Sequence, residues 1–143
     1  MDYKIDDKNL DVSMFISFVN QVWQGNYDVE QTRMALSKTL NITAYDNKKL
    51  VGCLRILSDD YYFGTITELL VLPEYQHQGL ASRLMEHLIA DAQEKGREGL
   101  ILTCKDRLIG FYERFGYKNL GLSQSVHGGA VWYDMILEFP REK

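Results

Sequence analysis

Apolar positions near the start of the chain change from a weak strand period to a helical one. Residues 1–6 alternate weakly and predict a short first strand. In the segment 11–23 the apolar residues recur three and four positions apart, and Gly25-Asn26 ends this predicted helix. Asp28 and Gln31 are spaced as a capping pair for a second helix, which we expect to end near Thr39. The chain therefore opens with one strand and two helices.

Three strands follow, separated by polar turns. Residues 40–45 alternate as a strand, and the polar run 46–49 turns the chain into a second strand over 50–57, which predicts a hairpin. A second turn at 58–60 leads into a long strand over 62–72. Pro73 ends that strand, because proline supplies no donor to a sheet.

The apolar period becomes helical again from Gly79. One face of this predicted helix carries Leu80, Leu84, Leu88, Ile89 and Ala92. Gly96 stands just past its end, where a left-handed cap is usual.

The last third of the chain predicts a strand, a helix and a hairpin. Residues 100–104 form a short, fully apolar strand of the kind that is buried in a sheet. Residues 106–115 predict a helix closed by Gly116. Residues 117–126 and 130–139 predict a hairpin around His127-Gly128-Gly129.

The element order is β-α-α-β-β-β-α-β-α-β-β. The strand, helix and strand in the middle predict a parallel pair joined by a right-handed crossover, whereas the flanking hairpins are antiparallel. We therefore expect an α+β fold: a mixed, mostly antiparallel sheet with a central parallel strand pair and helices on both faces. At 143 residues the chain is long enough for a single domain, 1–143, and too short for two ordinary ones.

Charge and composition limit the classes of molecule that this protein is expected to bind. The net charge is −4 and no block of Lys or Arg occurs, which argues against nucleic acid as a partner and mildly favours a cationic substrate. No apolar run approaches the ~20 residues of a membrane span, so we expect no membrane partner. No signal peptide precedes the first strand, and we expect a cytoplasmic protein. Cys53 and Cys104 sit in apolar stretches without metal-ligand spacing, so we expect buried thiols and no metal.

The segment 70–84 joins a buried strand to the start of a helix. The first N–H groups of a helix lack intrahelical partners and carry partial positive charge, so they bind anions such as phosphate. Gly79 and Ala81 leave room for a ligand to approach these amides. No Gly-Lys-Ser/Thr follows, which excludes a Walker loop, and the glycine spacing differs from a Rossmann fingerprint.

The pattern Val71-x-Pro73-x-x-Gln76-x-x-Gly79-x-Ala81 resembles the acyl-CoA-binding motif of the GNAT superfamily of N-acyltransferases. The family's second landmark, an aromatic-Tyr followed by a Gly-aromatic pair, is matched by Phe111-Tyr112 and Gly116-Tyr117. The element order is also similar to the family's order, over essentially the whole chain.

The resemblance implies acetyl-CoA as co-substrate and assigns its contacts. Main-chain groups of Leu70 and Val71 would pair with the pantetheine arm. The turn and helix start would hold the pyrophosphate, with the residues Gln76, His77, Gln78, Gly79, Leu80, Ala81 and Ser82. This chain departs from the family in three places: Gln76 replaces a common arginine, Ala81 a frequent glycine, and Lys105 a common asparagine.

Acylation of an amine also needs a proton acceptor and a group that stabilises the departing thiolate. The resemblance places the Tyr112 hydroxyl near the sulfur and the N–H of Val71 at the thioester carbonyl. Glu68 interrupts the apolar end of the long strand, and we interpret it as a base, as an anchor for a cationic amine, or as an outward-facing strand residue. The weaker candidates are Asp59, Asp60 and Asp134, and we expect His77, His87 and His127 to be loop or surface residues.

The predicted function is acetyl-CoA-dependent transfer of an acyl group to a primary amine of a small molecule or a protein N-terminus, by direct attack in a ternary complex. The alternative is a catalytically silent acyl-CoA-binding sensor or interaction module. A homodimer is left open. The amine-binding wall would come from the first two helices and the final hairpin, with the candidates Trp23, Tyr27, Tyr61 and Trp132, unless these aromatic residues belong to the core.

Overall fold

The computed structural model describes residues 1–124 and 127–140, without the side chain of His127. It divides into two compact units, Met1–Leu57 with Thr67–Ala92 and Ser58–Ile66 with Gln93–Lys143. The described strands pair in the order β1-β2-β3-β4-β5-β7-β6, which confirms the mixed α+β fold. The observed element order also matches the predicted one, with short 3₁₀ turns added.

Two capped helices open the first unit. Helix α1 (Val12–Val22) begins at Asp11, whose side chain accepts a hydrogen bond from the N–H of Met14. Helix α2 (Val29–Lys38) begins at Asp28, whose Oδ2 accepts from the N–H of Gln31 at 2.8 Å. The capping position expected from the sequence is therefore confirmed.

The strands of the first unit are β1 (Asp2–Lys4), β2 (Leu40–Asp46), β3 (Lys49–Ser58) and the end of β4 (Phe63–Val71). The pairings β1–β2 and β2–β3 are antiparallel. The tight turn of the predicted hairpin is formed by Asn47 and Lys48, which both have positive φ angles (47° and 70°).

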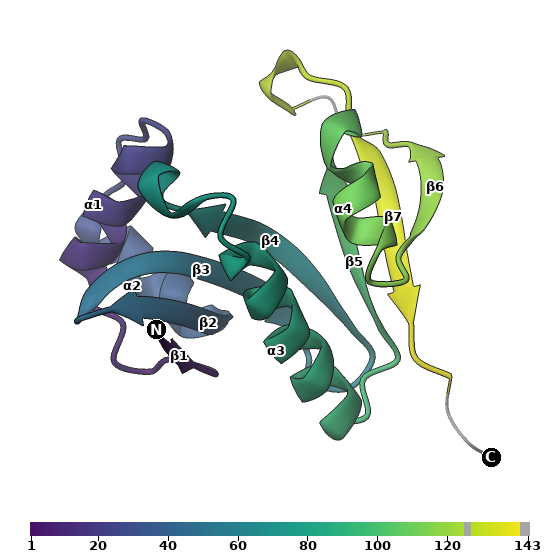
Figure 1. Cartoon of the computed structure of the whole chain (residues 1–143), viewed down its shortest axis with the longest axis horizontal. Helices are drawn as coiled ribbons and strands as arrows, with labels where there is room; N and C mark the ends of the chain where they lie inside the picture. The colour runs from purple at the N-terminus through teal and green to yellow at the C-terminus, as the bar shows by residue number, and fades with distance from the viewer. Residues whose placement is uncertain (125–126, 141–143) are drawn as a thin grey trace. The chain divides into compact units, whose positions relative to one another are not determined.

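Helices cover both faces of β2 and β3, so these strands are buried on both sides instead of alternating (Figure 1). On one face the Arg55 guanidinium lies 5.6 Å from the ring of Phe15 in α1. On the other face a Cβ at Gly52 would lie 3.1 Å from Leu84 of α3 (Leu80–Glu94). The helix α3 buries Met85 and leaves Ile89 only half-buried, which corrects the apolar face expected from the sequence.

The second unit contains the start of β4, β5 (Gly99–Cys104), β6 (Lys118–Leu122) and β7 (Tyr133–Glu138). The parallel pair is confirmed, because Phe63–Thr65 of β4 run alongside Gly99–Ile101 of β5. Strand β7 lies between β5 and β6 and is antiparallel to both. The predicted helix 106–115 divides into a 3₁₀ turn, η2 (Asp106–Leu108), and a short α4 (Ile109–Glu113).

The expectation that β5 is fully buried was wrong. Its burial alternates, and Ile101 is 36% exposed. Leu100, Leu102 and Cys104 share the covered face, where the Cys104 Sγ lies 3.5 Å from the Met135 Sδ. Among the described residues, the opposite face, which carries Ile101 and Thr103, is the more exposed one. Cys53 and Cys104 are both buried free thiols, as expected. The part of the final hairpin predicted at 125–126 lies outside the described residues.

Candidate active site

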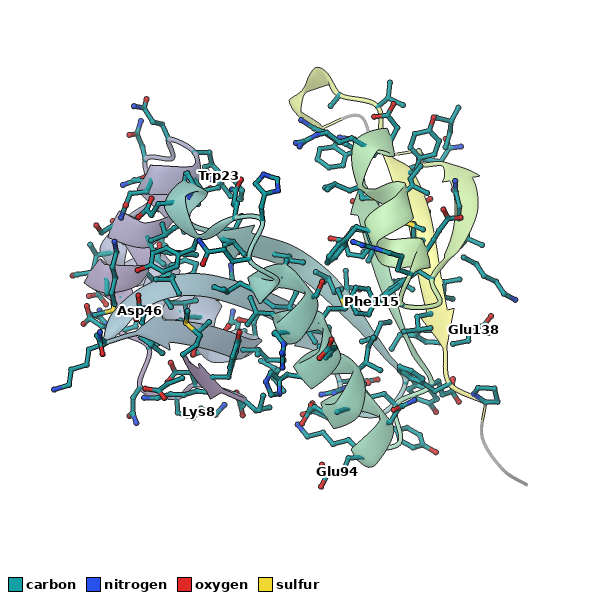
Figure 2. The ribbon with its side chains drawn as sticks, in the orientation of Figure 1. Lys8, Trp23, Asp46, Glu94, Phe115 and Glu138 are labelled. Carbon is teal, nitrogen blue, oxygen red and sulfur yellow. The ribbon has the colours of Figure 1, made fainter. Side chains whose placement is uncertain are left out.

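The predicted coenzyme-binding residues lie together in the first unit, where β4 passes into α3. Leu70 and Val71 end the strand, and the N–H of Leu72 continues the pairing to β3 by donating to the carbonyl of Val51 at 3.0 Å. The 3₁₀ turn η1 (Pro73–Tyr75) follows. This turn is fastened to the β2–β3 hairpin, because the Tyr75 hydroxyl donates to Asp46 Oδ2 at 2.6 Å (Asp46 is labelled in Figure 2).

Gly79 stands at the start of α3 with open space around it. Its φ is +84°, a left-handed conformation that side chains other than glycine rarely adopt. A Cβ added there would have no described atom within 4 Å. The first helical bond of α3 runs from the N–H of Arg83 to the carbonyl of Gly79 at 3.0 Å, so the preceding N–H groups have no intrahelical acceptor. Among the described residues, the turn therefore has amides without a backbone acceptor and open space beside Gly79, as a phosphate site requires.

Gln76 has a local role that the sequence pattern did not reveal. Its side-chain Nε2 donates to the carbonyl of Val71 at 3.1 Å, and so it closes the turn back onto the end of β4. Gln78 similarly donates to the carbonyl of Glu74 at 3.2 Å, and His77 adopts a φ of +64°. Gln76 thus stabilises the turn at the position where, by the resemblance, an arginine is common.

Glu68 lies in the middle of β4 and forms an ion pair with Arg55 of β3. Both side chains are only 14% exposed. The interpretation of Glu68 as an outward-facing strand residue was therefore wrong. Sequence reasoning missed Arg55, because its partner is thirteen positions away and only the β3–β4 pairing brings the two together.

Tyr112 lies in α4 of the second unit and is 7% exposed. Its ring packs edge-on against Phe111 (5.1 Å between centroids) and Tyr117 (5.6 Å). Burial, and to a smaller extent the nearby Cys104 thiol, raises the pKa of Tyr112 to about 12. Because its pKa is raised, the hydroxyl is protonated at neutral pH. In the described part of the chain, no residue forms a hydrogen bond with it.

The weaker acidic candidates shape turns or lie in strands. Asp59 accepts hydrogen bonds from the N–H groups of Tyr61 and Tyr62, both at 2.9 Å. Asp60 forms an ion pair with the buried Arg97, with 2.6 Å between Oδ1 and Nη2. Asp134 lies in β7 opposite Thr103. Asp59 and Asp60 thus stabilise the local turn structure, as expected of turn aspartates. The expectation for His127 concerns a side chain outside the described residues.

The aromatic candidates for the amine-binding wall are mostly exposed. Trp23, just past the end of α1 and labelled in Figure 2, is 41% exposed. Its Nε1 donates to the Tyr27 hydroxyl at 3.0 Å. Tyr27 and Tyr61 are each 48% exposed, so these three side chains are not core residues. In the second unit the Lys105 ammonium lies 5.8 Å from the ring of Trp132.

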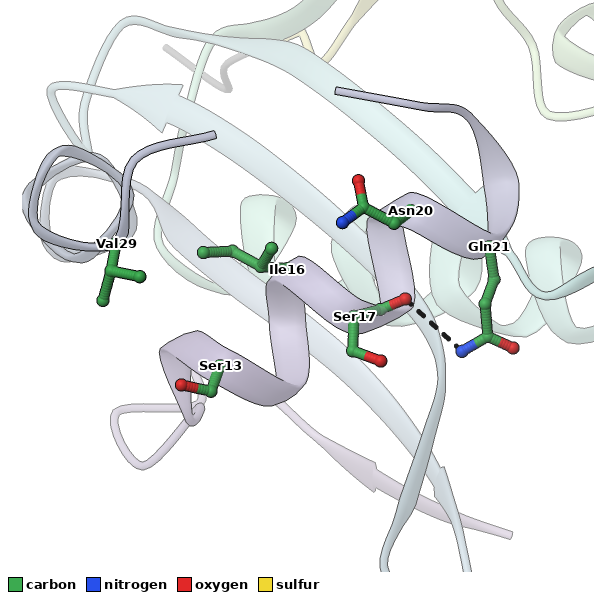
Figure 3. A pocket seen from close by; sticks show the side chains of 6 residues that line it. All are labelled: Ser13, Ile16, Ser17, Asn20, Gln21 and Val29. Atoms are coloured by element: carbon green, nitrogen blue, oxygen red, sulfur yellow. Dashed lines mark hydrogen bonds between the residues drawn. The ribbon is translucent and has the colours of Figure 1, made fainter. Parts of the chain in front are cut away.

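A shallow pocket of about 500 Å³ lies on the outer side of α1 and the start of α2 (Figure 3). It is lined by Ser13, Ile16, Ser17, Asn20, Gln21 and Val29. None of these is a predicted site residue, and the Gln21 amide already donates to the Ser17 carbonyl. In the described part of the chain, no group of three or more His, Cys, Asp or Glu side chains is placed to bind a metal, and no helix has the length and apolar character to cross a membrane.

The mixed sheet, the parallel β4–β5 pair and the open turn before α3 match the fold that the resemblance implies. A family profile described as "Acetyltransferase (GNAT) domain" matches residues 7–139. The chain belongs to the GNAT acetyltransferase family.

Relatives among curated proteins cover different shares of the chain. GCN5-related N-acetyltransferase 2, chloroplastic, of Arabidopsis thaliana is 35% identical over 88 residues, which are 60% of this chain and 32% of that protein. Uncharacterized N-acetyltransferase ycf52-like of Prochlorococcus marinus is 25% identical over 131 residues, which are 88% of this chain and 71% of that protein. The chain spans 32% to 37% of the length of three plant relatives.

Solved structures with low sequence identity share the fold. An aminoglycoside 6'-N-acetyltransferase complexed with coenzyme A aligns with a TM-score of 0.82 at 17% identity, over 100% of both chains. The ribosomal-protein-S18-alanine N-acetyltransferase from Escherichia coli aligns with a TM-score of 0.82 at 20% identity, over 99% of this chain and 97% of that one. At these identities the likeness concerns the fold alone.

Proposed function

We propose that this protein is an acetyl-CoA-dependent N-acetyltransferase that transfers an acyl group to a primary amine by direct attack in a ternary complex. The observation that carries the proposal is the open turn at Gly79, with its φ of +84° and free amides at the start of α3. Membership of the GNAT family supports it. The pyrophosphate would rest on the amides of residues 78–82.

The end of β4 is suited to an extended ligand. Among the described residues, the parallel register with β5 covers only Phe63–Thr65. A peptide-like pantetheine arm could therefore add to the remaining edge of β4, at Leu70 and Val71, as a further strand would.

Bound acetyl-CoA supplies an acyl group activated as a thioester. Three groups of this chain act on the reaction. The N–H of Val71 would donate a hydrogen bond to the thioester carbonyl oxygen and so stabilise its developing charge. The Tyr112 hydroxyl would donate to the sulfur as it leaves. Glu68 would accept a proton from the attacking amine, directly or through a water, or would hold the amine in place.

The acceptor is proposed to be a small-molecule amine or a protein N-terminus. Two structural neighbours are named for an aminoglycoside and for an alanine of ribosomal protein S18, a small molecule and a protein. A net charge of −4 and the exposed pair Trp23 and Tyr27 are compatible with a cationic amine, since aromatic faces attract cations. The cytoplasmic location and the homodimer stay predictions.

The test is release of free thiol from acetyl-CoA across a panel of amines, including aminoglycosides and peptides with free N-termini. Turnover with at least one amine supports the enzyme. Coenzyme binding by calorimetry without turnover on the whole panel would instead indicate the silent module.

Gly79→Ala tests the turn itself. It should weaken coenzyme A binding, because the new methyl group fills the space in which the phosphate would lie. Gly96→Ala is the matched control: it has a φ of +72° at the other end of α3 and equally open surroundings. Both variants carry a similar left-handed strain of about 1–2 kcal/mol, so a loss of affinity confined to Gly79→Ala isolates the ligand contact. Equal affinities in the two variants would refute the phosphate site.

A further inference from the structure

Arg55 is held in place from several directions within the first unit. Its Nη1 pairs with Glu68 Oε1, and its Nε donates to the Thr39 hydroxyl at 3.3 Å. Its guanidinium carbon lies 5.6 Å from the centre of the Phe15 ring. One guanidinium thus connects α1, the C-cap of α2, β3 and β4.

The contact with Thr39 continues into a buried polar network. The Thr39 hydroxyl donates to Asn41 Oδ1 at 2.7 Å, and Asn41 Nδ2 donates to the carbonyl of Leu36 at 2.9 Å. Thr39 and Asn41 are 8% and 4% exposed. The Arg55 side chain is therefore fixed by groups that are themselves fixed, which is the arrangement that orients a functional side chain accurately.

Stability alone does not explain this pair. Replacing a buried ion pair with apolar residues of similar volume is often neutral or stabilising, so the pair is weak evidence for a structural role. One carboxylate oxygen of Glu68 is occupied by Arg55, and the described residues supply no hydrogen-bond donor to the other, Oε2. The pair thus leaves one charged, half-buried acceptor in a defined orientation.

We propose that Arg55 is a positioning residue for Glu68: it holds the carboxylate so that Oε2 accepts an N–H from the acceptor amine. This inference rests on the proposed function, since it assumes that Glu68 meets the amine. Arg55 touches neither substrate. Its influence passes through Glu68, and misplacement of that carboxylate by about 1 Å would cost about 10²-fold in rate.

A double-mutant cycle tests the proposal with Arg55→Met, Glu68→Gln and the double variant. We expect Arg55→Met to lower kcat by about 10²-fold while the calorimetric affinity for acetyl-CoA stays near the wild-type value. The double variant should be no slower than Glu68→Gln alone, because the effect of Arg55 requires the carboxylate. Arg55→Lys keeps the charge and should recover part of the lost kcat. Arg33→Met, which breaks the exposed Arg33–Glu30 pair of α2, is the control and should leave kcat unchanged.

The outcomes separate the inference from the proposed function. An inactive wild-type protein over the whole amine panel would overturn both. An active wild type whose two single effects on kcat multiply in the double variant would overturn the positioning role alone. Thermal unfolding of each variant shows whether it is folded. If Arg55→Met is destabilised, the double variant can be used instead, because it lacks the unpaired carboxylate. The kcat of the double variant relative to that of Glu68→Gln then tests the positioning role of Arg55. A wild-type kcat for folded Arg55→Met would also overturn the inference.

Discussion

Replacing Tyr112 with phenylalanine removes one hydroxyl from the aromatic cluster of α4 and tests whether that hydroxyl assists the departing thiolate. Burial raises the pKa of Tyr112 to about 12, whereas an alkyl thiol has a pKa near ~8.5. Full proton transfer from the phenol to a free thiolate would therefore be uphill by about 5 kcal/mol. We infer that the hydroxyl acts as a hydrogen-bond donor to developing charge and remains protonated.

That argument sets the expected size of the effect. Acid–base groups contribute about 10²- to 10⁴-fold, and a donor that keeps its proton belongs near the lower end, at about 10²-fold. The single-turnover rate of acyl transfer is the quantity to measure, because slow product release can mask a slower chemical step. The loss should shrink with an acyl donor whose leaving thiol is more acidic, since that thiolate needs less stabilisation.

Two measurements control the experiment. Tyr117→Phe removes a neighbouring buried hydroxyl from the same cluster and should leave the rate near that of the wild type. The free energy of unfolding of Tyr112→Phe should be unchanged or slightly higher, because no described group pairs with the lost hydroxyl. Equal single-turnover rates for Tyr112→Phe and the wild type would refute the reasoning and leave Tyr112 as a core aromatic residue.

Three further predictions concern the base, the buried phenols and the helix caps. Glu68→Gln keeps the side-chain shape and should lower turnover by about 10²-fold or more at unchanged coenzyme affinity; wild-type kinetics over the full pH range would remove Glu68 from the reaction. Burial raises the pKa values of Tyr112 and Tyr117 above their unfolded value, so the native state binds more protons than the unfolded state above about pH 10. This stabilisation is complete below pH 10 and is lost as the pH rises through the folded pKa values. The free energy of unfolding should therefore fall above pH 10, and it should fall less steeply in Tyr112→Phe. Equal slopes in the wild type and the variant would contradict a raised pKa of Tyr112. Asp28→Ala removes the N-cap of α2 and should cost about 1 kcal/mol in chemical denaturation, and no change would show that the cap is dispensable.

Much of the local geometry at the candidate site could be predicted, because it depends on residues that are close together in the sequence. The proline that ends β4, the glycine before α3 and the apolar period of that helix lie within about twenty residues, and each acts through backbone geometry. The same holds for Asp28, whose carboxylate meets an amide three positions along the chain. Even so, the φ of +84° at Gly79 adds a conformational reason for glycine where the sequence suggested only a steric one.

Contacts between distant segments required the folded chain. Arg55 meets Glu68 only because β3 and β4 lie side by side, and neither residue's neighbours along the sequence indicate the pair. The insertion of β7 between β5 and β6 likewise depends on which strand edges β7 pairs with, and the local periodicity of β7 does not specify those partners. The exposure of Ile101 depends on which elements cover each face of β5. A short apolar run in the sequence does not indicate whether one face or both faces of the strand are covered. Periodicity and turn residues act over a few positions and so specify the elements, whereas strand neighbours and ion pairs arise from side chains that only the packed sheet brings together.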